Sequence, residues 1–156
     1  QDCIIETDLE ILIPETYVGN TSERLQLYSR LDNIRDEHQL MQFSTELRDR
    51  FGELPPSVNE LINSVRMRWL GEKAGFEKIS LKGNKLRGYF VSNKDAYFSS
   101  SMFSGILQFV QTNSRTCRLR DQAGKPLLII DPVDTVDKAI QLLSRMTGAI
   151  DEPVAK

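Results

Sequence analysis

The sequence predicts an α+β fold: a strand and three helices form an N-terminal part, and a ββαββα part with an antiparallel sheet follows. Apolar residues alternate with polar ones at the start of the chain and again after Gly75, as in strands. In between they recur at every third or fourth position, as in helices. We expect one domain over residues 1–150, with sub-parts of about 1–75 and 76–150, and a frayed tail at 151–156.

Residues 3–13 predict a half-buried strand, because acidic and apolar side chains alternate along them. The apolar set would share one face (Ile5, Leu9, Ile11 and Ile13) and the acidic set the other (Glu6, Asp8 and Glu10). Pro14 would end the strand, since proline has no N–H to donate.

The first helix is expected to begin after a cap at Asn20, with Glu23 three residues on, or at Ser22. Its apolar positions lie at helical spacing: Leu27, Leu31 and Ile34. The second helix would start near Asp36 and bury Leu40, Phe43 and Leu47. It would stop after Phe51, where Gly52 can adopt the left-handed cap conformation.

The third helix is expected to follow Pro55 and Pro56, with Ser57 and Glu60 as a capping box. Its apolar stripe would consist of Leu61, Ile62, Val65 and Trp69, and Gly71 or Gly75 would end it.

The second half predicts two hairpins and two helices. Residues 76–91 read as two strands joined at Gly83-Asn84, and residues 115–121 and 125–131 as two more joined at Ala123-Gly124. A helix over residues 99–112 would lie between the hairpins. A last helix from about Asp134 would bury Val136, Ile140, Leu143 and Met146.

The composition, 40% hydrophobic and 27% charged, is that of a soluble globular protein without the ~20-residue apolar run of a membrane span. We therefore expect no membrane partner and a cytoplasmic location, where Cys3 and Cys117 would be reduced strand residues. No secretion signal precedes the first strand, and the start at Gln1 indicates a fragment of a longer polypeptide.

Charge is divided unevenly along the chain. Residues 1–60 contain 13 acidic and 5 basic residues, a formal charge of −8, whereas residues 61–156 carry 9 and 15, a charge of +6. The acidic part could contact a basic partner, or the two parts could attract each other.

The sequence indicates no catalytic, cofactor or metal site. The single histidine, His38, has no nucleophile beside it, and no phosphate-binding glycine loop occurs. Glu6, Asp8 and Glu10 lack the loop spacing and the glycine of a calcium site. A small-molecule enzyme is the third-ranked hypothesis and would require a concave pocket with convergent titratable groups.

Nucleic-acid binding is the second-ranked hypothesis. Arg66 and Arg68 lie near Trp69 on the third helix, and basic residues recur around a later strand: Arg115, Arg118 and Arg120. The net charge of −2 and the lack of aromatic residues among the strand arginines argue against it.

An acidic pair on the second helix gives the first-ranked hypothesis, a protein-interaction surface. Glu46 and Asp49 are three residues apart, so they share one helix face. Carboxylates near a helix C-terminus are disfavoured by the helix dipole, by ~0.3–1 kcal/mol, which suggests a compensating partner. That partner could simply be Arg50, four residues beyond Glu46.

The strand ending in Ile13-Pro14, the segment "RLQLYSRL" and the segment "ELRDRFGELP" together resemble the C-terminal domain of bacterial transcription-repair coupling factors. The resemblance covers residues 4 to about 75. It implies a regulatory domain of a large ATP-driven DNA translocase that removes stalled RNA polymerase and recruits nucleotide-excision repair. ATP and Mg²⁺ would bind to other parts of that polypeptide, and no cofactor to this fragment.

The resemblance further implies that this domain docks on the N-terminal repair-recruiting module of the same polypeptide. Docking would mask the site for the excision-repair damage-recognition ATPase and restrain the motor. By position, the acidic contacts of the family fall on Glu46 and Asp49, and Phe51, Gly52, Leu54 and Pro55 would be scaffold. Charge reversal of both acids should leave the fold intact and weaken docking, less so at high salt.

Overall fold

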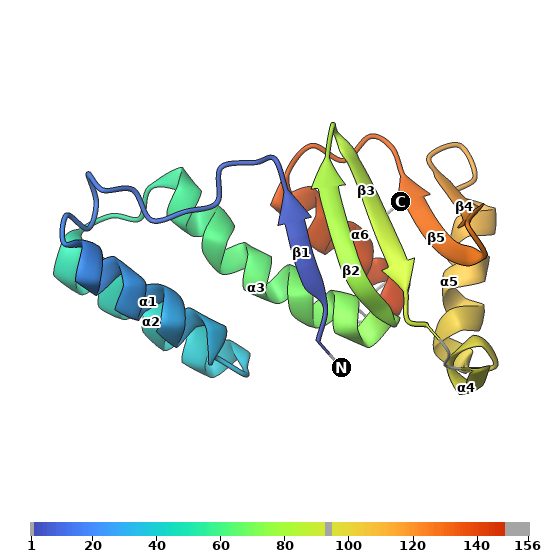
Figure 1. Ribbon diagram of the computed structural model, residues 1–156, viewed down its shortest axis with the longest axis horizontal. Coiled ribbons are helices and arrows are strands. Elements are labelled where there is room, and N and C mark those ends of the chain that lie inside the picture. Colours follow the sequence, from blue (N-terminus) through green and yellow to red (C-terminus); the bar gives the residue numbers. More distant parts are fainter. Residues whose placement is uncertain (1, 93–94, 149–156) are drawn as a thin grey trace. The chain divides into compact units, whose positions relative to one another are not determined.

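The computed structural model describes residues 2–92 and 95–148, and the predicted tail at 151–156 lies outside them. The described elements follow the predicted order, except that a short helix that was not predicted, α4, precedes α5 (Figure 1). They are β1 (Ile4–Thr7), α1 (Thr21–Asp32), α2 (Glu37–Phe51), α3 (Pro56–Ala74), β2 (Phe76–Lys82), β3 (Lys85–Phe90), α4 (Asp95–Phe98), α5 (Ser101–Thr112), β4 (Cys117–Gln122), β5 (Lys125–Ile130) and α6 (Val136–Thr147). The α+β class is confirmed.

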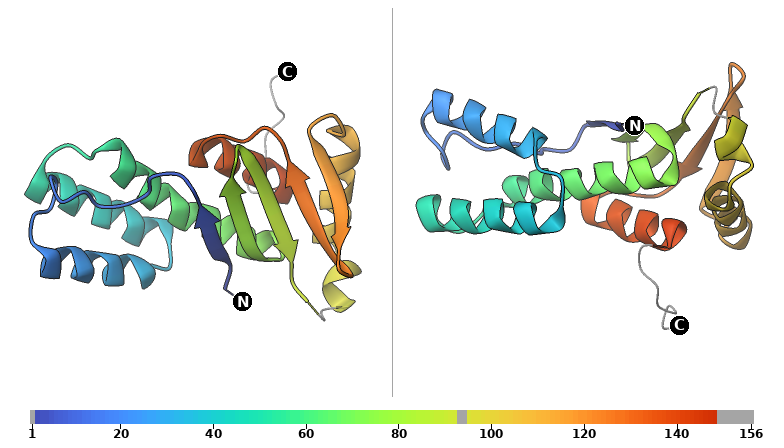
Figure 2. Two further views of the ribbon diagram at one scale, coloured as in Figure 1. Left: turned by 45° about the horizontal axis from the view of Figure 1, so that its top comes forward. Right: turned by 90° about the horizontal axis from the view of Figure 1, so that it is seen from below.

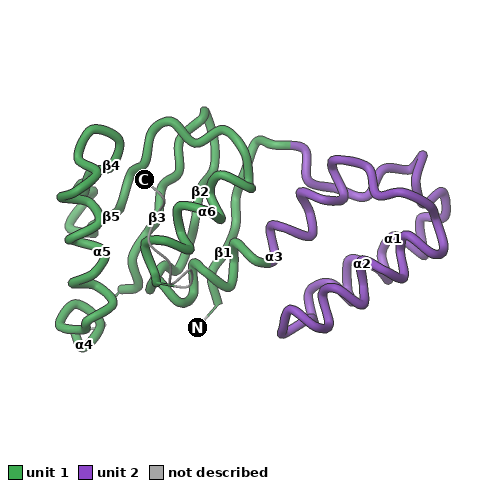
Figure 3. Tube along the Cα trace, turned by 180° about the vertical axis from the view of Figure 1, so that it is seen from behind, with its two compact units in different colours: residues 1–9, 66–156 green, residues 10–65 purple. Residues whose placement is uncertain are grey.

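The chain divides into two compact units (Figure 3). One contains residues 10–65, with α1, α2 and the first part of α3. The other contains residues 1–9 and 66–156, with the sheet, the rest of α3 and the later helices. The expected sub-parts were two consecutive stretches of the chain. The observed units are not consecutive, because the first strand pairs with a strand of the second half.

The sheet has the strand order β1-β2-β3-β5-β4. β2, β3, β5 and β4 are antiparallel neighbours, as predicted. β1 lies parallel to β2, in the register Ile4↔Lys78 to Thr7↔Leu81, so the five-stranded sheet is mixed; the sequence had predicted no partner for this first strand. A parallel neighbour requires a long crossover connection, and residues 8–75 provide it.

The first strand is shorter than predicted, four residues rather than eleven. The Thr7 hydroxyl donates to the Leu81 carbonyl oxygen (2.7 Å) and accepts from the Leu9 amide (3.0 Å), which turns the chain away from the sheet. Ile13 is buried, but in the unit of residues 10–65, where its amide donates to the Tyr28 hydroxyl (2.8 Å). The alternation of apolar and acidic residues therefore continues to Ile13, although the pairing of β1 with β2 ends at Thr7.

Helix caps were largely predicted by local sequence. Asn20 caps α1 by accepting from the Glu23 amide (2.9 Å), and Asp36 caps α2 by accepting from Gln39 (2.8 Å). Gly52 ends α2, as predicted, with φ 94° and ψ −170°. Essentially only glycine adopts this conformation, which differs from the predicted left-handed helical one.

The predicted capping box of the third helix is absent. α3 begins at Pro56, and the Val58 amide donates to the Pro55 carbonyl oxygen (3.0 Å), so Ser57 lies inside the first turn. Proline is well suited to the first helical position, because its φ is already helical and its missing N–H is not needed there.

Both predicted hairpin turns are confirmed. Gly83 and Asn84 have φ of 59° each, and Ala123 and Gly124 have φ of 55° and 81°. Positive φ at both central residues matches the right-handed twist of the flanking strands.

One face of the sheet is covered by helices (Figure 1 and Figure 2). α6 and the C-terminal part of α3 lie behind the strands in Figure 1, and α5 lies behind the β4–β5 hairpin. The strand side chains on that face form the core of the unit: Ile79, Leu81, Leu86, Leu128 and Ile130. Among the described elements of this unit, no helix covers the opposite face, which we call the open face.

Candidate functional site

The acidic pair lies on a helical hairpin. α1 and α2 are joined by residues 33–36, and their apolar stripes (Leu27 and Leu31; Leu40, Phe43 and Leu47) are buried. The opposite stripe of α2 is exposed and carries the charged residues. The period of 3.6 residues therefore separates packing positions from surface positions on the same helix.

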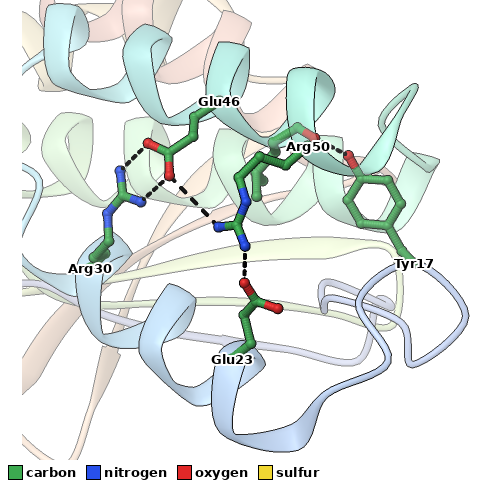
Figure 4. Close-up of polar contacts among 6 residues, drawn as sticks. Tyr17, Glu23, Arg30, Glu46 and Arg50 are labelled. Carbon is green, nitrogen blue, oxygen red and sulfur yellow. Dashed lines mark hydrogen bonds and ion pairs between the residues drawn. The ribbon is translucent and has the colours of Figure 1, made fainter.

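Glu46 is held by two arginines (Figure 4). Arg30 of α1 donates Nη1 to Glu46 Oε2 (2.8 Å) and Nη2 to Oε1 (3.1 Å), a bidentate pair. Arg50 Nη1 lies 3.9 Å from Glu46 Oε2, and its Nη2 also pairs with Glu23. The hydrogen bonds from Arg30 lower the pKa of Glu46, although partial desolvation opposes this effect.

The predicted i, i+4 pair with Arg50 thus exists but is the longer contact. Arg30 and Glu23 were missed by sequence reasoning, because they lie 16 and 27 residues away from their partners. No pattern in the linear sequence marks these pairings, which depend on how α1 and α2 face each other.

Asp49, by contrast, has no such partners among the described residues. Its side chain is exposed and makes no hydrogen bond or ion pair with any residue that the structure describes. It is one turn from Glu46, as predicted, and both acids line the same groove. Asp49 is therefore a carboxylate available to a cation from outside.

The groove has a volume of about 770 Å³ and is wide and shallow. It is lined by Arg30, His38, Met41, Gln42, Thr45, Glu46, Asp49 and Arg50. Met41 is 46% exposed, so an apolar side chain lies beside the charged residues of the groove. The mixture of paired charges, one unpaired acid and an exposed thioether suits a protein surface better than an enclosed substrate.

The C-terminal end of α2 is fastened by Tyr17. The Tyr17 hydroxyl lies 2.7 Å from the Gly52 carbonyl oxygen and 3.2 Å from that of Leu47, so it can donate to either one. Its ring packs against Phe51 (centroids 5.7 Å apart), and the Arg50 guanidinium lies 4.6 Å above the Phe51 ring. These contacts fix the last turn of α2, which carries Asp49 and Arg50.

The five arginines of the alternative site do not form one patch. Arg118 and Arg120 point to the open face from β4, with the buried Cys117 on the other side of the strand. Arg66 and Arg68 lie on α3, about 200° apart around the helix, and not on a strand of the sheet. Arg115 is exposed in the turn before β4.

Cys3 and Cys117 are buried and free of disulfides; Cys117 begins β4, as a strand residue, whereas Cys3 lies just before β1 rather than within it. Within residues 2–92 and 95–148, no cluster of His, Cys, Asp or Glu could hold a metal ion. None of the described helices is long and apolar enough to cross a membrane.

The fold and the groove define an α+β domain with an exposed, charged helical hairpin. The chain belongs to the TRCF domain family, whose sequence model matches residues 7–101.

Relatives and a solved structure agree with this family. The chain is 32% identical to the transcription-repair-coupling factor of Rickettsia conorii and 31% to that of Rickettsia bellii, each over 116 residues, which are 74% of this chain and 10% of the relative. The Escherichia coli K12 factor is 29% identical over 108 residues, 69% of this chain and 9% of the relative. The chain thus spans about a tenth of the length of these relatives. A crystal structure of the C-terminal domain of transcription-repair coupling factor has the same fold, with a TM-score of 0.74 at 16% identity and 96% coverage of both chains.

Proposed function

We propose that this chain is the regulatory domain of an ATP-dependent DNA translocase that couples transcription to nucleotide-excision repair. In this proposal the groove surface of α2 docks on the N-terminal repair-recruiting module of the same polypeptide and holds it closed. The observation that carries the proposal is the exposed, unpaired carboxylate of Asp49 beside Glu46 in the groove. The family membership supplies the context.

The rest of the polypeptide would supply the activity. The parent would bind ATP and Mg²⁺ in its motor, engage RNA polymerase and DNA, and recruit the excision-repair damage-recognition ATPase in the cytoplasm. This chain would then act by binding alone, with no cofactor of its own.

The two acids have separate roles in this docking. Glu46 accepts two hydrogen bonds from Arg30, so its main effect is to link α1 to α2 and to position the groove. Asp49 has no such partner among the described residues and is the direct contact to a basic partner surface. A polar interface of this kind can open at modest energetic cost, which suits a surface that must be released when polymerase is engaged.

The test is binding of this chain, added in trans, to the N-terminal module of its own parent at low and moderate salt. Asp49→Lys should weaken binding about tenfold or more at low salt, and less at moderate salt. Asp32→Lys is the matched control: Asp32 is an exposed acid of α1 outside the groove, so the same charge change should have little effect. Equal binding by wild type and Asp49→Lys would refute the assignment.

A further inference from the structure

We propose that the open face of the sheet is a binding site for duplex DNA, which it contacts through the phosphate backbone and without regard to base sequence. This site lies in the unit of residues 1–9 and 66–156 and is separate from the groove of α1 and α2.

The strand register places a set of basic side chains on this face. Ile79 and Leu81 of β2, Leu86 of β3 and Cys117 of β4 point into the core, so the residues that alternate with them point outward. The basic residues in outward positions are Lys78 and Lys82 of β2, Lys85 and Arg87 of β3, Lys125 of β5, and Arg118 and Arg120 of β4.

Acids on this face neutralise only some of these bases. Glu6 of β1 lies 3.8 Å from the Lys78 ammonium and 3.7 Å from that of Lys82. Asp131, just after β5, lies 3.9 Å from Lys85. Arg87, Arg118, Arg120 and Lys125 form no ion pair with any carboxylate of the described chain.

These four unpaired bases are neighbours. Arg87 pairs in register with Ile129, which pairs with Arg118, so the two guanidinium groups flank one residue of β5. Arg120 is the next outward residue of β4, and Lys125 lies at the hairpin end of β5. With neighbouring strands about 4.8 Å apart, Arg87 and Arg118 lie about 10 Å apart across the sheet. The cationic surface is therefore wider than a single phosphate chain.

The side chains of the open face suit a duplex better than a single strand. Proteins that bind single strands stack bases on exposed aromatic rings. On this face the described strands offer one aromatic ring, Tyr89, and the Lys78 ammonium lies 4.5 Å over it. A duplex requires no stacking ring and presents its phosphates on two chains, which matches long cations spread over three strands.

An acidic protein partner fits less well. Strong protein interfaces usually have a buried apolar or aromatic centre. The exposed large apolar residue of this face, Ile4, lies on the outermost strand β1, at the other edge of the sheet from Arg118 and Arg120. Nearer the centre, Leu127 of β5 is buried and Ile129 is only partly exposed, so these outward positions offer little apolar surface to a partner.

The test measures binding of the whole chain to a fluorescent 20-base-pair duplex of random sequence by anisotropy, over a range of salt concentrations. About four phosphate contacts predict a slope of log affinity against log salt near −3.6. The variant Arg87→Ala/Arg118→Ala/Arg120→Ala should lose at least tenfold in affinity at low salt, and its slope should fall in magnitude by about 2.7.

The matched control is Lys73→Ala/Lys138→Ala/Arg145→Ala. These three bases are exposed on α3 and α6, away from the open face, and their removal changes the net charge equally. Circular dichroism should show both variants folded. Equal losses in the two variants, or no salt-sensitive binding by the wild type, would overturn the proposal.

Two further arms test the choice of ligand and the independence of the two sites. Tighter binding to a single strand or to an RNA duplex of the same length would overturn the assignment to duplex DNA. Asp49→Lys should retain duplex binding, and the triple variant of the open face should retain docking to the N-terminal module. Failure of one proposal is thereby distinguished from failure of the other.

Discussion

Two carboxylates one helical turn apart, Glu46 and Asp49, differ in what surrounds them. Glu46 accepts two hydrogen bonds from Arg30, whereas the Asp49 side chain has no partner in the described chain. Two identical charges therefore have different surroundings: Glu46 links α2 to α1, and Asp49 is exposed to solvent.

The Arg30 contact gives a testable pH dependence. Because the folded pKa of Glu46 is lowered, its contribution to stability is complete above the unfolded value of about 4.5 and is lost as pH falls through the folded pKa. Glu46→Gln should cost about 0.2–1 kcal/mol at pH 7, the range of exposed pairs, and less near pH 3. Urea unfolding at both pH values measures this, with Asp32→Asn as the control. An equal cost at both values would show that the charge of Glu46 is unimportant.

Thiol reactivity tests the burial of Cys3. Desolvation raises the pKa of the Cys3 thiol to about 12 from 9.0, and burial also raises the pKa of Cys117. Since the thiolate is the reactive form, native Cys3 at pH 8 should react about a thousandfold more slowly than in the unfolded chain. Labelling of Cys117→Ser with a disulfide reagent isolates this thiol. Rapid labelling of the folded variant would show that Cys3 is accessible.

At the scale of elements, α3 packs closely at Gly71 against β2 and against the residue just before β1. A Cβ atom at this position would lie 2.7 Å from Cys3 Sγ and 2.7 Å from Ile79 Cδ1. The close contact explains why an interior helical position holds a glycine, which costs about 1 kcal/mol in helix propensity.

Gly71→Ala should therefore destabilise the chain by about 1–3 kcal/mol, because overpacking outweighs the gain in propensity. Gly105→Ala is the matched control, since Gly105 lies in the exposed interior of α5 and nothing is within 4 Å of its missing Cβ. That variant should gain up to about 1 kcal/mol. Urea unfolding of both variants is the measurement, and stabilisation by both would mean that α3 can move away from the sheet.

The end of α2 depends on Tyr17 in a similar way. Tyr17→Phe removes the hydroxyl beside the Gly52 and Leu47 carbonyl oxygens but keeps the ring against Phe51. We expect a loss of about 0.5–1.5 kcal/mol and faster amide exchange in the last turn of α2. Tyr28→Phe, which removes another hydroxyl of the same unit, should leave exchange at the end of α2 unchanged.

At the scale of the whole molecule, charge is separated between surfaces of different units. The groove of α1 and α2 offers an unpaired acid, and the open face of the sheet offers four unpaired bases among the described residues. The formal net charge of −2 shows neither feature, because acids and bases nearly cancel over the whole chain. The groove itself is close to neutral, because Arg30 and Arg50 line it together with Glu46 and Asp49, whereas the open face carries an excess of bases.

Autoinhibition predicts a gain of activity in the full-length parent. If α2 holds the motor restrained, Asp49→Lys should raise the ATPase rate in the absence of polymerase about fivefold or more, the range of typical coupling between sites. Asp32→Lys should leave this rate unchanged. A lower rate in Asp49→Lys would mean that the groove activates the motor rather than restraining it.

Local sequence predicted much of the fold. The caps at Asn20 and Asp36, the glycine stop at Gly52 and the hairpin turn at Gly83-Asn84 depend on residues within four positions of one another, and all form where expected. The position of the acidic pair on its helix was also predictable from local sequence, because a spacing of three residues puts Glu46 and Asp49 on one helix face.

By itself, then, the sequence determined where helices and turns form and which of their faces carry charge, because these depend on short-range geometry. Only the tertiary structure decided that β1 pairs in parallel with β2, that Arg30 rather than Arg50 is the closer partner of Glu46, and that β5 pairs with β3 as well as with β4. Each of these is a contact between residues far apart in the chain. Such contacts arise when helices and strands pack together, and the spacing of residues along the sequence does not encode them.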